Sequence, residues 1–95
     1  MLGLRWMALP ALNCGINYEV HKDKIIIIKE NEHLEIPLSK INCGFIALNT
    51  LYIEVENPEG SENKYTYYTL KTDNLVELYR CLSELNIEVL RLYAF

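Results

Sequence analysis

The segment "DKIIIIKENEHLEIPLSKI", residues 23–41, contains four consecutive isoleucines, Ile25 to Ile28, and its conformation sets the architecture of the chain. A membrane span needs about 20 apolar residues, several times the length of this run. A helix is disfavoured because each β-branched side chain loses rotamer freedom there. The run therefore predicts a strand of about six residues that is covered on both faces.

The segments on either side of this run predict two neighbouring strands. Residues 16–20 and 34–38 each alternate apolar with polar side chains, which is the period of a half-buried strand. Polar turns at 22–23 and 30–32 separate them from the isoleucines. We expect an antiparallel meander with the isoleucine strand in the middle. Pro37 favours an edge position or a bend for the third strand, because proline donates no ladder hydrogen bond.

The β pattern continues in the second half of the chain. The dipeptide Cys43-Gly44 predicts a bend or bulge. Residues 51–56 alternate again, and "NPEGSEN", residues 57–63, has the composition of a polar hairpin loop. The following "YTYYTL", residues 65–70, is rich in the tyrosine and threonine that strands favour, so it predicts the returning strand of the hairpin.

The period then changes to that of a helix. Apolar residues recur at three- and four-residue steps over 73–85, which predicts one amphipathic helix. Its start can be capped at 72–73 or by Asn74, whose partner would be Glu77. Asn86 can take the left-handed conformation that often ends a helix.

Length and composition indicate a single folded domain that spans 1–95. We divide it into an apolar N-terminal strap at 1–14, antiparallel strands at 16–71, the helix at 73–85, and residues 87–95. The last segment does not alternate cleanly, so it predicts either a final strand or an extension of the helix.

Charge and cysteine content restrict the partners and the compartment. The net charge of −4 disfavours nucleic acid and anionic lipid, because an acidic chain repels phosphate groups. The cysteines Cys14, Cys43 and Cys81 form no C-x-x-C pair, which gives no support to a zinc site. We expect reduced thiols and a cytoplasmic location, with membrane association as the alternative.

That alternative depends on the N-terminal strap. Its apolar part is too short to cross a bilayer and lacks a signal-peptide cleavage pattern, so we interpret it as a cover for the core. A signal remnant or the end of a truncated anchor remains an alternative. Membrane contact would use its apolar side chains, which are Leu2, Leu4, Trp6, Met7 and Leu9.

Four stretches together resemble the bacterial pleckstrin-homology-like (PH-like) domain: "YEVHKDKIIII", "IPLSKI", "LYIEV" and "LKTDNLVELYRCLSEL", all within residues 18–85. The resemblance implies an α+β fold that is mainly antiparallel β. It would be a PH-like barrel or sandwich of about six or seven strands, capped by a C-terminal amphipathic helix. The apolar N-terminus and the segment after the helix depart from the family pattern.

In the eukaryotic relatives of that family, basic side chains in the first hairpin bind inositol phosphates. Here the hairpin offers Lys22 and Lys24, diluted by Glu19, His21 and Asp23. This is too little positive charge to hold several phosphate groups, so phosphoinositide binding is disfavoured.

The tyrosines are the candidate binding residues. Tyr52, Tyr65, Tyr67 and Tyr68 fall in one predicted hairpin, whose neighbouring strands bring some of them to a common face. Tyrosine is enriched at protein interfaces, which favours a surface for a partner. Simple cross-strand packing is the alternative.

The other polar residues indicate no reaction centre. His21 and His33 are each two residues from a glutamate, yet their strands should lie about 9–10 Å apart, too far for a joint zinc site. Glu54 and Glu56 share a strand face, where we interpret them as solvated surface carboxylates. We predict that the protein is not an enzyme and needs no cofactor or metal.

The expected function is a non-catalytic module for protein interaction or self-association, which docks through a sheet edge and the tyrosine-rich face. The partner would be another protein or a second copy of the chain. Two alternatives stay open: a membrane-peripheral module that uses the apolar N-terminus, and a small-ligand-binding domain with a pocket between sheet and helix.

Overall fold

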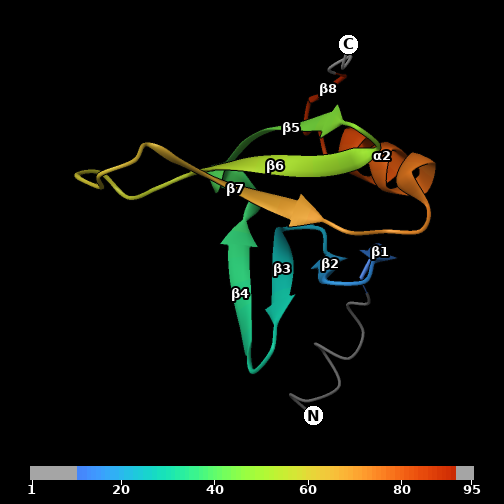
Figure 1. Ribbon diagram of the computed structural model, residues 1–95, viewed down its shortest axis with the longest axis horizontal. Coiled ribbons are helices and arrows are strands. Elements are labelled where there is room, and N and C mark those ends of the chain that lie inside the picture. Colours follow the sequence, from blue (N-terminus) through green and yellow to red (C-terminus); the bar gives the residue numbers. More distant parts are fainter. Residues whose placement is uncertain (1–10, 92–95) are drawn as a thin grey trace.

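The computed structural model describes residues 11–91, which form two four-stranded β-sheets and one helix (Figure 1). The first sheet has the order β1-β2-β3-β4 and the second has the order β7-β6-β5-β8. The strands of the first sheet are β1 (Asn13–Cys14), β2 (Tyr18–Val20), β3 (Lys24–Lys29) and β4 (Glu32–Pro37). Those of the second are β5 (Ile41–Ala47), β6 (Thr50–Glu56), β7 (Tyr65–Leu70) and β8 (Val89–Arg91). The helix, α2, spans Leu75–Glu84.

The isoleucine run is the middle strand of the meander, as predicted. In β3, Ile25 pairs with Val20 of β2 on one side and with Ile36 of β4 on the other. The prediction that both faces are covered is wrong for this strand. Ile25 and Ile27 are buried, whereas the two isoleucines between and after them are only half-buried. The reason is that their face of the sheet is otherwise polar and stays hydrated.

The predicted first strand is shorter than its pattern. Tyr18 and Val20 are fully buried, but Ile16 lies before β2 and is 66% exposed. Two residues assigned to the N-terminal strap, Asn13 and Cys14, instead form β1 at the edge of the first sheet. The earlier part of the strap, with the five apolar residues proposed for membrane contact, lies outside the described residues. No helix in the described part of the chain is long and apolar enough to cross a membrane.

The link between the sheets follows β4. Pro37 ends that strand, which is an edge strand as predicted, and a 3-10 turn at Leu38–Lys40 leads into β5. The register of β5 against β6 shifts between Ile41 and Cys43, close to the predicted bulge. The strands of the first sheet run across those of the second (Figure 1). Within residues 11–91 the two sheets stay separate and form no closed barrel. The α+β class with mainly antiparallel strands is therefore confirmed, and the described strands form two sheets that cross each other (Figure 1).

The helix and the strand after it complete the second sheet. The helix begins at the cap we considered, with the Asn74 side chain accepting a hydrogen bond from Glu77 N–H, and Asn86 after it has a φ of 66°. The ambiguous C-terminal segment forms β8, which pairs with β5 in parallel. Because a parallel neighbour requires a crossover, the helix carries the chain from β7 to the opposite edge of the sheet. Residues 92–95 lie outside the described residues.

One core joins these elements. The inner faces of both sheets and the buried face of the helix contribute to it, and its fully buried side chains include Tyr18, Ile25, Leu51, Ile53, Leu70, Leu78 and Leu82. The opposite face of the second sheet is therefore left toward solvent, and the candidate site lies on it.

Candidate functional site

The outward face of the second sheet gathers aromatic side chains from adjacent strands. Residues directly opposite in a ladder point to the same face. Phe45 of β5 is opposite Tyr52 of β6 on one side and Leu90 of β8 on the other. Tyr67 and Tyr65 of β7 are opposite Glu54 and Glu56, which share the face of Tyr52. We call the set Phe45, Tyr52, Tyr65, Tyr67 and Leu90 the aromatic face.

Three of the four tyrosines named from the sequence lie on this face. They are Tyr52, Tyr65 and Tyr67, of which Tyr67 is 52% exposed. Tyr68 points to the opposite side, where it is half-buried and packs against the core. The strand alternation of β7 places it there, since successive residues face opposite sides.

The rings of the aromatic face contact one another across three strands. Phe45 stacks on Tyr52 with ring centroids 5.1 Å apart and planes 16° apart. Tyr67 meets Phe45 edge-on, with centroids 5.9 Å apart. Such pairs hold the rings in defined orientations. Phe45, Tyr52 and Tyr67 thus form one connected cluster of rings across β5, β6 and β7.

A carboxylate is held beside these rings. Glu54 Oε2 accepts a hydrogen bond of 2.7 Å from the Tyr67 hydroxyl. Its Oε1 accepts one of 2.5 Å from Asn42 Nδ2 and a longer contact of 3.8 Å from Cys43 Sγ. A carboxylate offers about four acceptor positions, so part of this capacity stays open to solvent.

These contacts shift the proton affinities of the groups involved. The hydrogen bonds from Asn42 and then from Tyr67 hold the pKa of the Glu54 carboxyl below its ordinary value. The same bond to Glu54 raises the pKa of the Tyr67 hydroxyl. Burial, followed by the nearby Glu54 charge, raises the pKa of the Cys43 thiol. The cluster is therefore a fixed negative charge beside a protonated thiol, which is a poor nucleophile.

Sequence reasoning missed Phe45 and Leu90 of this face, and it missed that Asn42 and Tyr67 hold Glu54 in place beside it. The β5–β6 hairpin explains why. Leu48 and Asn49 form its two-residue turn with φ of 53° and 63°, and leucine is not a residue that signals such a turn. Had the turn been recognised, its symmetry would have placed Phe45 opposite Tyr52.

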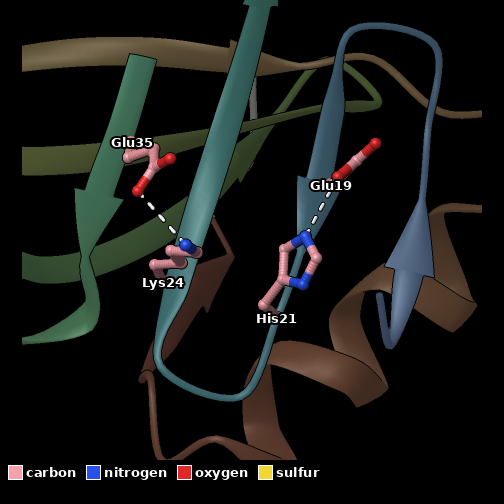
Figure 2. Close-up of polar contacts among 4 residues, drawn as sticks. All are labelled: Glu19, His21, Lys24 and Glu35. Carbon is pink, nitrogen blue, oxygen red and sulfur yellow. Dashed lines mark hydrogen bonds and ion pairs between the residues drawn. The ribbon is translucent and has the colours of Figure 1, made fainter. Parts of the chain in front are cut away.

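The outward face of the first sheet is polar instead. Figure 2 shows His21 pointing to Glu19 of β2 and Lys24 of β3 pointing to Glu35 of β4. The His21 Nε2 to Glu19 Oε1 distance is 3.0 Å, and the Lys24 Nζ to Glu35 Oε1 distance is 3.1 Å. Of the two lysines of the first hairpin, which we judged too few to bind phosphates, Lys24 is thus already paired with a carboxylate.

A depression of about 400 Å³ lies between β1 and the start of the helix. Its lining includes Cys14, Thr72 and Asn74. The Thr72 and Asn74 side chains are already engaged within the chain, because they accept hydrogen bonds from the backbone N–H groups of Asn74 and Glu77, respectively.

Cys14, Cys43 and Cys81 are free thiols. No group of three or more metal-ligating side chains lies together in the described part of the chain.

No protein-family model matches the sequence, and neither does any curated protein.

Proposed function

We propose that this chain is a non-catalytic interaction module that binds a protein partner on the aromatic face, and that the partner inserts an arginine side chain beside Glu54. The carrying observation is the Glu54 carboxylate, fixed by Asn42 and Tyr67 next to stacked rings on a solvent-facing sheet. We also propose that the fold is PH-like, which is supported by the order of strands followed by a helix. The proposed location is cytoplasmic, which is supported by the free thiols.

The composition of the face favours a protein over a small molecule. Tyrosine and phenylalanine supply large contact areas with little loss of side-chain freedom, which is why aromatic residues dominate protein interfaces. The rings here are already ordered by their mutual contacts. A partner would therefore meet a prearranged surface, which lowers the entropy cost of binding.

The charge of the face favours a basic side chain. Within the strands, the outward positions carry Glu54 and Glu56 and no lysine or arginine, and the nearby Lys64, before β7, lies over the Tyr65 ring at 5.5 Å from its centroid. Two copies docked face to face would bring these carboxylates together, which is unfavourable. An arginine suits the site better, because its planar guanidinium can donate to Glu54 while stacking on an aromatic ring.

The test is a selection of random displayed peptides against the folded protein. We expect the selected peptides to be enriched in arginine, and we expect Glu54→Gln and Tyr67→Ala each to weaken their binding by about tenfold or more. Tyr79→Ala is the matched control, because Tyr79 is an exposed tyrosine on α2, which lies on the inner face of the sheet. Peptides without arginine enrichment, or peptides that bind all variants equally, would rule the proposal out.

A further inference from the structure

A second surface, the free edge of β7, is independent of the aromatic face because it consists of backbone groups. In β7 the backbone groups of successive residues point alternately toward β6 and away from it. The carbonyl of Lys64 accepts from Asn57 N–H on the β6 side. Thr69 O and Lys71 N instead bond the Asn17 side chain on the other side. By this alternation, the N–H and C=O groups of Tyr65 and Tyr67 point away from the sheet.

The open part of this edge has two defined ends. No described residue forms a hydrogen bond with the outward backbone groups of Tyr65 or Tyr67. At the C-terminal end, the Asn17 amide occupies the place of a neighbouring strand beside Thr69. At the N-terminal end, the strand begins at Tyr65, after the hairpin loop that projects from the body (Figure 1). The free segment is therefore three residues long, Tyr65–Tyr67.

This edge lacks the protection found on the other long edge. The edge strand β4 carries Glu32 and Glu35 and ends at Pro37, and such residues oppose strand addition. The remaining edge strands, β1 and β8, have two and three residues. By contrast, β7 reads "YTYYTL", with no charge, proline or glycine. An uncharged strand of this composition is a template for pairing, and no like charges would oppose a second copy of it.

We propose that two copies of the chain pair through β7 in antiparallel orientation, with the twofold axis at Thr66. In this register Tyr65 of one copy is opposite Tyr67 of the other, and both pairs exchange two backbone hydrogen bonds. An axis at Tyr67 would instead direct Tyr65 to Thr69, whose carbonyl is already bound by Asn17. With the axis at Thr66, all outward N–H and C=O groups of Tyr65 and Tyr67 are paired. The pairing stops before Thr69, whose carbonyl Asn17 already binds. The second sheets of the two copies would together form one continuous eight-stranded sheet.

The first test locates the axis by cross-linking in a Cys14→Ser background, which removes the exposed native thiol. The two Thr66 residues would form a pair that is not hydrogen-bonded, with Cα atoms about 4.5 Å apart, within disulfide range. Under mild oxidation we expect Thr66→Cys to give a covalent dimer and Ser83→Cys, on the exposed side of α2, to give none. Equal cross-linking of the two variants would overturn the proposal.

The second test separates backbone from side chain. Tyr65→Pro removes an outward N–H at the first residue of an edge strand, where proline is tolerated, and leaves the ladder with β6 intact. In sedimentation at increasing concentration, we expect the unmodified protein and Tyr65→Ala to dimerise and Tyr65→Pro to remain monomeric. Dimerisation of the proline variant, or a monomeric unmodified protein at high concentration, would contradict the pairing.

A third test uses the unmodified protein, so its result does not depend on whether the proline variant folds. The amide resonances of Tyr65 and Tyr67 should shift as the concentration rises, while those of Thr66 and Tyr68, already paired with β6, should stay nearly constant. Shifts confined to any other segment would mean that the copies associate elsewhere, which would refute this register.

Discussion

The Asn17 side chain donates a hydrogen bond of 3.0 Å to the backbone carbonyl of Thr69, which lies 52 residues later in the chain. Its Oδ1 also accepts from Lys71 N–H at 2.9 Å. One amide thus pairs with the β7 backbone as a strand residue would. It connects the first sheet to the edge of the second and limits how far another strand could extend along that edge.

We expect Asn17→Ala to destabilise the fold by about 1–3 kcal/mol, because it leaves a donor and an acceptor of the edge without their partner. Urea unfolding of both proteins measures the difference. Asn63→Ala is the matched control, since Asn63 is an exposed loop asparagine whose backbone carbonyl, not its side chain, accepts from Asn57. Its free energy of unfolding should change by less than about 0.5 kcal/mol.

The Glu54 carboxyl should titrate below its ordinary pKa, and Tyr67→Phe should move that pKa upward because one of the two strong donors is lost. Tyr65→Phe should leave it unchanged, since Tyr65 is opposite Glu56 instead. Carbonyl NMR shifts recorded against pH give both values. An identical Glu54 pKa in the two variants would show that the Tyr67 bond does not form in solution.

The two shifts imply opposite dependences of stability on pH. Because the folded pKa of Glu54 is lowered, its contribution is present above the unfolded value and is lost as the pH falls through the folded pKa. Because the folded pKa of Tyr67 is raised, its contribution is complete below the unfolded value near 10.0 and is lost as the pH rises through the folded pKa. Urea unfolding at acid, neutral and alkaline pH should show both losses. Tyr67→Phe should reduce the alkaline loss without abolishing it, because the raised pKa values of Tyr18, Cys43 and Cys81 also contribute there.

Gly15→Ala should destabilise the fold by about 3 kcal/mol, the upper end for an overpacked site. A Cβ at this position would overlap the ring of buried Tyr18 and lie 2.6 Å from the Lys71 carbonyl oxygen. Gly60→Ala is the comparison, because Gly60 has a φ of 89° but open space around it. It should cost about 1 kcal/mol, from backbone strain alone. A smaller loss for Gly15→Ala would mean that the Tyr18 ring can move aside.

Leu48→Asn should stabilise the protein by about 0.5–1 kcal/mol. Leu48 holds a φ of 53° in the β5–β6 turn and is 77% exposed, so the substitution relieves strain without removing a core contact. Thermal unfolding of the two proteins measures the gain. The same change at Val76, which is 71% exposed in helix α2, should be destabilising or neutral, because asparagine gains nothing in a helix.

Local patterns were sufficient for most of the secondary structure. The patterns that predict it are local, since each involves residues only a few positions apart. They are the isoleucine run, the alternation around it and the three- and four-residue steps of the helix. The cap at Asn74 and the left-handed Asn86 are likewise local, since their conformations follow from the residue type itself. These features could therefore be predicted from the chain alone.

The candidate surfaces could be predicted only in part. Tyr52, Tyr65 and Tyr67 were named from composition, but the sequence did not show that Tyr68 points to the core or that Phe45 joins the other three. Their arrangement depends on the register across β5, β6 and β7, which the unexpected turn at Leu48 determines.

Most of the strands and the helix follow from the sequence alone, because hydrophobic period and turn chemistry act over a few residues. The two short strands β1 and β8 do not. Three features require the folded structure: β8 joins β5 in parallel, the sheets stay separate, and Asn17 closes one end of the β7 edge. Each of these involves residues tens of positions apart. Such contacts are selected by the packing of a shared core, and no local pattern specifies them.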